Sequence, residues 1–374
     1  MKLIALKDVC KINMGQSPNS SNYNDYGDGM PFFQGNADFG ERYPITRVWC
    51  NTPTKIAQAE DILISVRAPI GALNYAKEEC CIGRGLAAIT PDRNKVSQDF
   101  IYWALKGKKA ELNDKGNGST FKAISLKILE QTMIPDINFE QQHKCAENLE
   151  KIYGIIQNRR KELLALDDLI KARFVEMFGS IHESTKYPYI AVKDLTDVIS
   201  GGTPSRDRSE YWYNGTIPWV KTTELQNNVI KNVDEHITES GLAGSSAKMV
   251  PIGTVLVAMY GQGKTRGMTA YLGIEASTNQ ACACILPSEK IDSMFMWKYF
   301  ELSYDKLRSL AQGAGQPNLN GNMIKNFQVL VPPIELQKEF VSFVEQVDKS
   351  KVAVQKALDE TQTLFDSLMQ EYFG

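Results

Sequence analysis

Several residue types and patterns that mark enzymes, metalloproteins or membrane proteins are scarce in this chain. There are only three histidines, at positions 143, 182 and 236, and none has a serine or cysteine in a nucleophile motif near it. The seven cysteines form no Cys-x-x-Cys pair, so we expect reduced thiols in place of a zinc site. No apolar run approaches the roughly 20 residues of a membrane helix, and the first residues, MKLIALKDVC, lack a signal-peptide core. We therefore expect a cytoplasmic protein without a membrane segment, a metal or a cofactor.

An excess of positive charge is also missing. The 374 residues carry 42 Lys and Arg against 44 Asp and Glu, which gives a formal net charge of −2. Contacts to phosphates normally require surplus Lys and Arg, so this balance does not by itself indicate a nucleic-acid-binding protein. Any DNA-binding surface must be a local basic patch or must be shared with a more basic partner. The length suffices for two or three domains, each with its own core.

One stretch has several features of a nucleotide-binding loop. In LVAMYGQGKTRGMTAY, residues 256–271, an apolar run leads into Gly-Gln-Gly-Lys-Thr. The P-loop spacing G-x-x-x-x-G-K-[ST] needs a glycine where Ala258 stands, and a P-loop opens a helix whose N-terminus faces the phosphates. The residues after Arg266 instead alternate and soon reach another glycine. The pattern predicts a polar loop between two strands.

The chain contains an internal duplication. LKDVCKINMGQSP (6–18) and VKDLTDVISGGTP (192–204) share Lys, Asp, Gly and Pro at one constant offset. Further pairs follow in the same order: MPFFQGNADF with IPWVKTTEL, EDILISVRAPIG with IGTVLVAMYGQG, CCIGRGLAAITP with ASTNQACACILP, and GNGSTFKAISLKIL with GAGQPNLNGNMIKN. Each half ends at a proline-marked stop, IPDINFEQQ or VPPIELQ, before about forty residues without proline. Matching segments in a fixed order indicate one structural unit that occurs twice.

Both proline-free segments have the apolar periodicity of long helices. Apolar residues recur at alternating spacings of four and three, as in a coiled-coil seam. In the second segment these are Phe340, Val344, Val347, Val354, Leu358, Phe365, Leu368 and Tyr372. In the first they are Leu149, Ile152, Ile156, Leu163, Leu166, Ile170 and Met177, and the helix-stopping Gly179 closes the run. Ordinary helix packing also produces such stripes, but their length favours two helices that bury each other as a rod between two domains.

The blocks that precede these helices have a mixed α/β pattern. Short apolar runs, such as residues 62–66 and 255–259, are separated by Gly, Pro and Asn as β-strands are. Each block closes with a helix-like stretch, at residues 99–112 and 293–310. We therefore predict an α/β (α+β) chain with a first globular domain (1–139), a first long helix (140–179), a second globular domain (180–334) and a second long helix (335–374).

Motifs of DNA-modifying enzymes are missing from both blocks. A methyltransferase that acts on amino groups needs an Asn/Asp-Pro-Pro-aromatic turn, but the Pro-Pro pair here stands between Val331 and Ile334. A PD…ExK nuclease motif fails after Asp136, because Glu140 is followed by two glutamines. The absence of catalytic groups from a duplicated design predicts binding, with two related surfaces that present polar loops.

Several segments resemble the specificity subunits of type I restriction-modification systems. VKDLTDVISGGTPSRDRSEYWYNGTIPWVKTTEL (192–225) is similar to the start of their target recognition domains, and SVRAPIG, CIGRGLAAI, TNQAC and VPPIELQKEF are similar to further parts of the pattern. The resemblance covers nearly the whole chain. It implies a non-catalytic subunit with two target recognition domains, joined by two long helices that form an antiparallel coiled coil. Each domain would read one half of a bipartite site in double-stranded DNA, and the helices would set the unread gap.

The same resemblance implies protein partners. The helices would dock two methyltransferase (M) subunits, which bind S-adenosylmethionine and methylate adenine, and it stays open whether restriction (R) subunits join. Partners that supply part of the phosphate-binding surface would explain the balanced charge of this chain. The first copy departs from the pattern, with MGQSP where the second has SGGTP and without the Lys-Thr turn. Two different half-sequences would require such divergence between the copies.

Polar residues in the loops of both copies are the candidate DNA contacts. Arg and Gln reach base edges in the major groove, whereas Lys mostly neutralises phosphate. The candidates are Gln34, Asn36, Arg67 and Arg84 in the first copy, and Thr203, Ser205, Lys221, Thr222, Gln262, Lys264 and Arg266 in the second. A structural ion pair is an equal alternative for Arg67 and Arg84, and a solvated surface loop is the alternative for the segment around Lys264.

Two other functions stay open at this point. One is a self-contained ATPase, which the loop spacing disfavours, and the other is a coiled-coil adaptor that never touches DNA. Binding of labelled duplexes by the protein and its methyltransferase partner separates the DNA reader from the adaptor.

Overall fold

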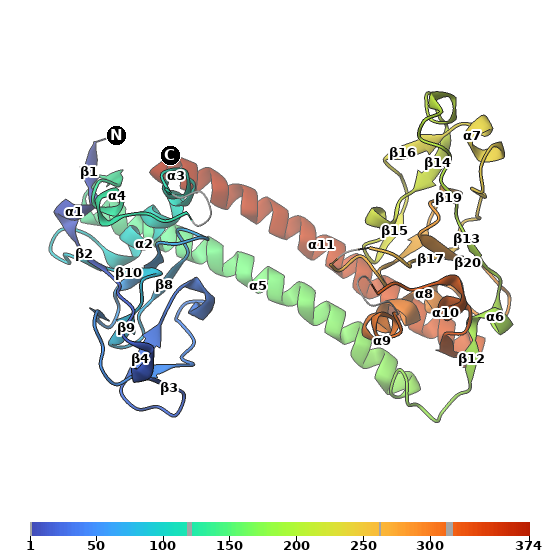
Figure 1. The fold of residues 1–374 in the computed structure, drawn as a ribbon, viewed down its shortest axis with the longest axis horizontal. Helices are drawn as coiled ribbons and strands as arrows, with labels where there is room; N and C mark the ends of the chain where they lie inside the picture. The colour runs from blue at the N-terminus through green and yellow to red at the C-terminus, as the bar shows by residue number, and fades with distance from the viewer. Residues whose placement is uncertain (1, 118–121, 262, 312–316) are drawn as a thin grey trace. The chain divides into compact units, whose positions relative to one another are not determined.

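The computed structural model describes residues 2–117, 122–261, 263–311 and 317–374. The chain divides into two compact units, unit 1 with Met1–Lys161 and Gln355–Gly374, and unit 2 with Glu162–Val354. Two helices of 40 residues, α5 (Phe139–Phe178) and α11 (Ile334–Phe373), contribute to both units (Figure 1). Among the described residues, no helix combines the length and the apolar character that crossing a membrane requires.

Unit 1 is built from short strands and short helices. Its strands are β1 (Leu3–Ala5), β2 (Cys10–Met14), β3 (Tyr23–Asn24), β4 (Met30–Phe33), β5 (Trp49–Cys50), β6 (Ile56–Ala57), β7 (Ile62–Ser65), β8 (Leu73–Tyr75), β9 (Cys80–Ile82), β10 (Leu86–Pro91) and β11 (Met133–Pro135). Its other helices are α1 (Leu6–Val9), α2 (Gln98–Gly107), α3 (Lys109–Asp114), α4 (Leu126–Glu130) and the 3-10 helices η1 (Ser20–Asn22) and η2 (Asn36–Asp38). They form an antiparallel sheet in the order β2-β10-β7-β8, a sheet in the order β3-β5-β4-β9-β6 with β4 parallel to β9, and the pair β1-β11.

Unit 2 has the corresponding elements. Its strands are β12 (Tyr189–Ala191), β13 (Val198–Ser200), β14 (Ile217–Val220), β15 (Asn228–Ile230), β16 (Glu235–Ile237), β17 (Val255–Ala258), β18 (Thr269–Leu272), β19 (Ser277–Thr278), β20 (Cys282–Ile285) and β21 (Gln328–Leu330). Its other helices are α6 (Val192–Leu195), α7 (Glu239–Ala243), α8 (Ser293–Leu302), α9 (Tyr304–Ser309), α10 (Gly321–Lys325) and the 3-10 helices η3 (Ser209–Tyr211) and η4 (Thr222–Glu224).

The topology of unit 1 recurs in unit 2. The order β13-β20-β17-β18 corresponds to β2-β10-β7-β8, the parallel pair β14 and β19 to β4 and β9, and the pair β12-β21 to β1-β11. Unit 2 adds β15 at the edge of its larger sheet. The mixed α/β fold predicted from the duplicated segments is therefore confirmed.

A buried glutamine ties the start of each long helix to its block. The Gln142 side chain is 3% exposed, accepts a hydrogen bond from the Ser97 N–H (2.7 Å) and donates one to the Ile137 carbonyl oxygen (2.8 Å). Gln337 is 1% exposed and makes the same two bonds in unit 2, with the Asp292 N–H (2.8 Å) and the Pro332 carbonyl oxygen (2.7 Å). A buried amide must be paired on both sides, which explains a glutamine in each helix entry.

The last turns of each long helix fill the core of the unit in which the helix ends. In unit 2, Phe174 and Phe178 of α5 are fully buried and lie 5.5 and 5.7 Å, between ring centroids, from Phe340 of α11. Phe178 also meets Phe295 of α8 at 5.5 Å. In unit 1 the equivalent aromatic contact joins Phe373 of α11 to α2, with its ring 5.6 Å from that of Phe100.

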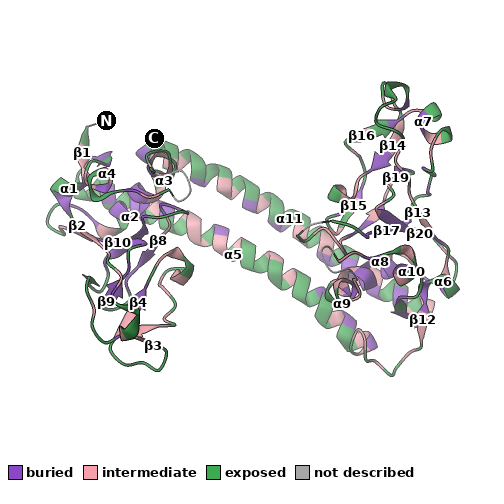
Figure 2. Cartoon of the chain, in the orientation of Figure 1, coloured by how far each residue is buried: buried purple, intermediate pink, exposed green. Residues whose placement is uncertain are grey.

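The two long helices run antiparallel in both units. In unit 1, Asn148 contacts Tyr372 (3.3 Å), whereas Arg160, further along α5, contacts Gln362 (3.4 Å). In unit 2, Lys351 bonds Asp167 (2.6 Å). Most of the predicted seam residues of α11 are buried, and both helices present exposed residues along much of their length (Figure 2). The two amphipathic stripes therefore bury each other, as the spacing of four and three predicts.

All seven cysteines are free thiols, and all except Cys145 are buried. Burial, helped by the negative charge of nearby Asp92, raises the pKa of Cys10 to about 12. Burial also raises the pKa of Cys80 to about 12 and that of Cys284 to about 11. Thiols held in the protonated form are poor nucleophiles and poor metal ligands, so these residues act as small core side chains.

The Phe174 contacts predict a large effect on stability. Phe174→Ala leaves a cavity among aromatic rings and is expected to lower the free energy of unfolding by about 3–5 kcal/mol. The matched control is Leu164→Ala in the same helix, because the Leu164 side chain is 66% exposed and its loss should change stability by only about 0.5 kcal/mol. Urea unfolding followed by circular dichroism measures both, and equal shifts in the two midpoints would contradict the assignment of Phe174 to the core.

Candidate nucleic-acid interface

In unit 1 the predicted site residues come together at one edge, where four strands end. Strands β4 and β9 are parallel and pair Phe33 with Ile82, so the residues that follow them lie side by side. Strand β10 pairs with β2 and with β7, and this brings the ends of these two strands to the same edge. We call the four segments that follow these strands, residues 15–17, 34–36, 66–67 and 83–85, the strand-end loops of unit 1.

Hydrogen bonds to the neighbouring chain segments hold the main chain of residues 83–85. The N–H groups donate from Gly83 to the Phe33 carbonyl oxygen (2.8 Å), from Arg84 to the Ser17 hydroxyl (3.2 Å) and from Gly85 to the Gln34 carbonyl oxygen (3.1 Å). The Ser17 hydroxyl in turn donates to Oε1 of Gln34 (3.0 Å), and the Gly85 carbonyl oxygen accepts from the Val66 N–H (2.9 Å). No N–H group of this turn is left for a ligand, so the side chain of Arg84 is the group it presents.

Unit 2 repeats this arrangement in its own strand-end loops, residues 201–203, 221–222, 259–260 and 279–281. The Asn279 N–H donates to the Val220 carbonyl oxygen (3.0 Å), and the Met259 N–H donates to the Ala281 carbonyl oxygen (2.8 Å). The Thr203 hydroxyl bonds the Gln280 side chain. These contacts make four pairs of positions equivalent: Ser17 with Thr203, Gln34 with Lys221, Arg67 with Tyr260, and Arg84 with Gln280.

The two arginines of unit 1 are exposed on these loops. Neither Arg67 nor Arg84 makes an ion pair or side-chain hydrogen bond with another described residue. Gln34 is also exposed, and its N–H donates to the Asp38 carboxylate (2.8 Å). Asn36 is half-buried in η2. No carboxylate of the described residues pairs with Arg67 or Arg84, as the alternative of structural ion pairs would require.

Lys221 lies in a cluster of charges that the sequence did not predict. Its ammonium group is 3.0 Å from the Glu235 carboxylate and 3.6 Å from that of Asp234. The hydrogen bond to Glu235 is the main cause that raises the pKa of Lys221. Arg206 pairs with the other oxygen of Glu235 (2.6 Å), and its guanidinium lies 3.6 Å from the centroid of the Trp212 ring. Both cations are therefore held in place by protein groups.

Sequence reasoning missed Arg206, which lies two residues beyond the Gly-Gly-Thr-Pro motif. A tryptophan six residues away was the only nearby indication, because Glu235 is far along the chain. Of the neighbouring candidates, Thr203 and Thr222 are half-buried, and Ser205 is exposed.

The loop between β17 and β18 leads into the antiparallel strand β18, and its described residues, 259–261 and 263–268, open no helix as a P-loop would. Lys264 is exposed, and its carbonyl oxygen accepts a hydrogen bond from the Tyr304 hydroxyl (2.7 Å). Arg308 donates to the Arg266 carbonyl oxygen (2.8 Å). The Arg266 guanidinium is half-buried and donates to the Pro317 carbonyl oxygen, so this side chain holds the loop. Gln262 lies outside the described residues.

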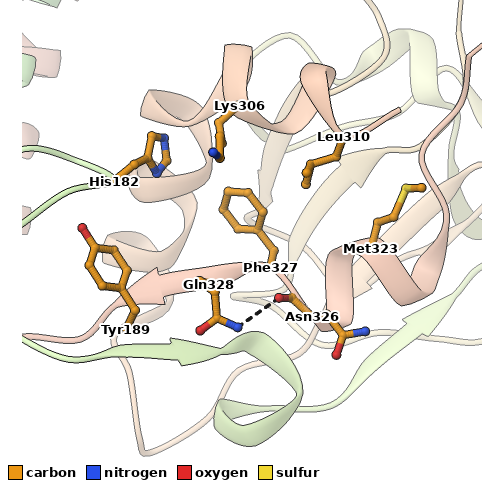
Figure 3. Close-up of a pocket in the computed structure, with 8 residues that line it drawn as sticks. All are labelled: His182, Tyr189, Lys306, Leu310, Met323, Asn326, Phe327 and Gln328. Carbon is orange, nitrogen blue, oxygen red and sulfur yellow. Dashed lines mark hydrogen bonds between the residues drawn. The ribbon is translucent and has the colours of Figure 1, made fainter. Parts of the chain in front are cut away.

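A separate pocket of about 550 Å³ lies in unit 2 beside β21 (Figure 3). Its lining comprises His182, Tyr189, Lys306, Leu310, Met323, Asn326, Phe327 and Gln328. Burial is the main cause that lowers the pKa of His182, and the positive charge of Lys306 adds to it. The described residues of the lining include no carboxylate and no thiol.

Two glycines of the strand-end loops allow a matched test of the turn at 83–85. A Cβ atom at Gly85 would overlap the Gln34 carbonyl oxygen, whereas one at Gly35, which is extended (φ −173°), would meet nothing within 4 Å. We expect Gly85→Ala to destabilise the protein by about 1–3 kcal/mol because the main chain must move. Gly35→Ala should leave the unfolding midpoint unchanged. Thermal unfolding measures both variants, and a Gly85→Ala protein as stable as the wild type would contradict the hydrogen-bonded turn.

Comparisons with known proteins agree on the family. The family model for the type I restriction modification DNA specificity domain matches residues 1–166 and again residues 184–361. The chain is 21% identical over 392 residues to the type I restriction enzyme MjaIX specificity subunit of Methanocaldococcus jannaschii, a match that covers 97% of this chain and 90% of that protein. A second relative from the same organism, a type I restriction enzyme MjaX specificity subunit, is 47% identical over 152 residues, or 41% of this chain and 36% of the relative.

Solved structures share the fold. The crystal structure of the type I restriction-modification S subunit from M. genitalium superposes with a TM-score of 0.62 at 15% identity, over 100% of this chain and 96% of that one. The family model matches well over half of the chain in two successive copies. The chain therefore belongs to the family of type I restriction-modification DNA specificity subunits.

Proposed function

We propose that this chain is the subunit that reads DNA sequence in a type I restriction-modification complex and has no catalytic site of its own. Each unit would read one half of a bipartite site in double-stranded DNA, in the cytoplasm where bacterial and archaeal DNA lies. One observation carries the proposal: equivalent main-chain hydrogen bonds hold a turn in each unit, and the two turns present different polar side chains, Arg84 in one unit and Gln280 in the other. A shared scaffold with different exposed groups is what two different half-sequences require.

Exposed polar side chains of the strand-end loops and of neighbouring segments are proposed to contact either bases or phosphates. Arg67, Arg84 and Gln34 of unit 1, and Gln280 of unit 2, are exposed and suited to base edges. Lys264 extends from an exposed loop and is suited to a phosphate. Lys221 and Arg206 share Glu235, so their net positive charge is small until DNA displaces part of that pairing. The balanced total charge then fits a complex in which partners supply further phosphate contacts.

The long helices are proposed to set the gap between the half-sequences and to dock the partners. Both continue without a break across the boundary between the units, at Lys161 in α5 and Val354 in α11. They also expose large apolar side chains, and Leu164 (66%) and Val352 (71%) are the most exposed of these. Large apolar side chains that are this exposed suit contact with a protein partner. We infer two methyltransferase (M) subunits that bind S-adenosylmethionine and methylate adenine, with restriction (R) subunits in a complex that also cleaves.

Selection from random duplexes tests the proposal against a coiled-coil adaptor that does not bind DNA. The protein, co-purified with its methyltransferase partner, is mixed with a library of random 30-base-pair duplexes, and the bound molecules are sequenced. We expect two short conserved clusters separated by a gap of fixed length. Partner alone is the control and should enrich neither cluster. Enrichment of no sequence by the complex would reject the DNA-reading function and support the adaptor.

Lengthening both helices tests their role in the gap. Insertion of seven helix-forming residues after Lys161 and after Val354 keeps the seam in register and adds about 10 Å to each helix. At about 3.4 Å per base pair we expect the selected gap to grow by roughly three base pairs, with both half-sequences kept. Insertion into α11 alone is the control, because it moves the seam residues out of pairing and should weaken binding to every site. An unchanged gap in the double insertion would contradict the proposal that the helices set the gap. Altered half-sequences would assign base reading to the helices.

A further inference from the structure

We propose that positions 84 and 280 are equivalent base-reading positions of the two units, where Arg84 selects guanine and Gln280 selects adenine. This inference rests on the proposed function and adds to it the identity of one base in each half-site. It follows from the main chain around these residues, their exposure and the chemistry of their side chains.

Close packing and hydrogen bonds hold the main chain of the turn at Arg84. Its two flanking glycines pack against Gln34 so closely that a Cβ atom at either would collide with that residue. The N–H groups of residues 83–85 are all bonded to other segments of unit 1. These contacts hold the main chain of the turn, so the Arg84 side chain projects from a constant Cα position. Such preorganisation reduces the entropic cost of a contact.

The turn at Gln280 is fixed in the same way but by different side chains. The Asn279 N–H is bonded to Val220, and the Ala281 N–H donates to Oδ1 of Asn279 (3.2 Å). The exposed amide of Gln280 is oriented by the Thr203 hydroxyl at its Oε1 atom. That oxygen has a second lone pair and the amide nitrogen has two hydrogens, so both halves of the amide stay available.

The hydrogen-bonding groups of the two side chains match two different bases. A guanidinium donates two hydrogen bonds to O6 and N7 of guanine, whereas a primary amide both donates to N7 and accepts from N6 of adenine. A good bidentate contact separates the right from the wrong base by about 10-fold to 100-fold in affinity. Arg84 has no acidic partner among the described residues, so no internal ion pair competes for it.

Other polar residues of the strand-end loops are less suited to this task. Lys221 is occupied by two carboxylates. At the position equivalent to Arg67, unit 2 has Tyr260, which is 42% exposed and has a single hydroxyl for hydrogen bonding. Positions 84 and 280 are therefore the equivalent pair at which both units carry an exposed side chain capable of two directed hydrogen bonds.

Reciprocal substitution tests the inference in the complete complex with its methyltransferase partner. Wild type, Arg84→Gln and Gln280→Arg are each used to select bound duplexes from the random library. We expect Arg84→Gln to replace guanine by adenine at one position of one half-sequence, with the other half and the gap unchanged. Gln280→Arg should make the opposite change in the other half. The preference for the original base should fall by about 10-fold to 100-fold at each position.

Two further variants separate base reading from charge and from folding. Arg84→Lys keeps the charge but loses the planar fork, so binding should persist with a weaker guanine preference. Arg93→Gln removes the same charge from unit 1 beyond the opposite end of β10, and it should leave the selected sequence unchanged. Thermal unfolding of each variant confirms a folded protein.

The outcomes distinguish this inference from the proposed function. A split site for the wild type and for Arg84→Gln, with the same bases and only a uniform loss of affinity, would overturn base reading at position 84 and leave the proposed function standing. A wild-type complex that selects no split site would overturn both. Exchange of guanine and adenine at the two positions supports the inference.

Discussion

The fold depends on aromatic packing between the last turns of each long helix and the block in which that helix ends. Phe174 and Phe178 of α5 complete the core of unit 2, and Phe365 and Phe373 of α11 are buried in unit 1, where Phe373 packs against Phe100. Unit 1 is therefore discontinuous in sequence, with residues 1–161 and 355–374, whereas unit 2 is the continuous segment 162–354. The core of each unit includes the far end of a long helix that began in the other. Cutting α5 would remove the covalent connection between the two blocks, and cutting α11 would detach the segment that carries Phe365 and Phe373.

In the repeated units, main-chain hydrogen bonds of the strand-end loops are shared and the exposed side chains differ. Two main-chain hydrogen bonds that position the strand-end loops of unit 1, from Gly83 to Phe33 and from Val66 to Gly85, recur in unit 2 as the bonds from Asn279 to Val220 and from Met259 to Ala281. The exposed side chains are free to differ, as Arg84 and Gln280 do. Side-chain identity at these positions therefore has little influence on the stability of the turn. This arrangement suits a protein whose copies share one architecture and are proposed to recognise two sequences.

Much of the architecture could be predicted from the sequence because it depends on local patterns. Proline stops and the spacing of apolar residues predict the long helices, and the order of matching segments predicts a repeated α/β unit. The periodicity predicts Met177 as a seam residue, but the fully buried side chains there are Phe174 and Phe178, which contact Phe340 of α11 and Phe295 of α8. That difference depends on tertiary contacts, which the spacing of apolar residues along one helix does not reveal.

The candidate site was predictable only in outline. The loops that follow the strands carry the predicted polar residues of both copies, but the roles of individual side chains depend on partners distant in sequence. Arg266 bonds the Pro317 carbonyl group, and Arg206 meets a carboxylate 29 positions further on. No spacing rule reveals such partners, because loop conformation determines them.

The turn at residues 83–85 has an evolutionary consequence. Its amide groups are satisfied within the protein, so folding does not depend on what the central side chain contacts. Under the proposed base reading, a single codon change at this position alters the preferred base while the free energy of unfolding stays nearly constant. Selection can therefore diversify recognition without passing through unstable intermediates, and each of the two copies can drift independently of its sister.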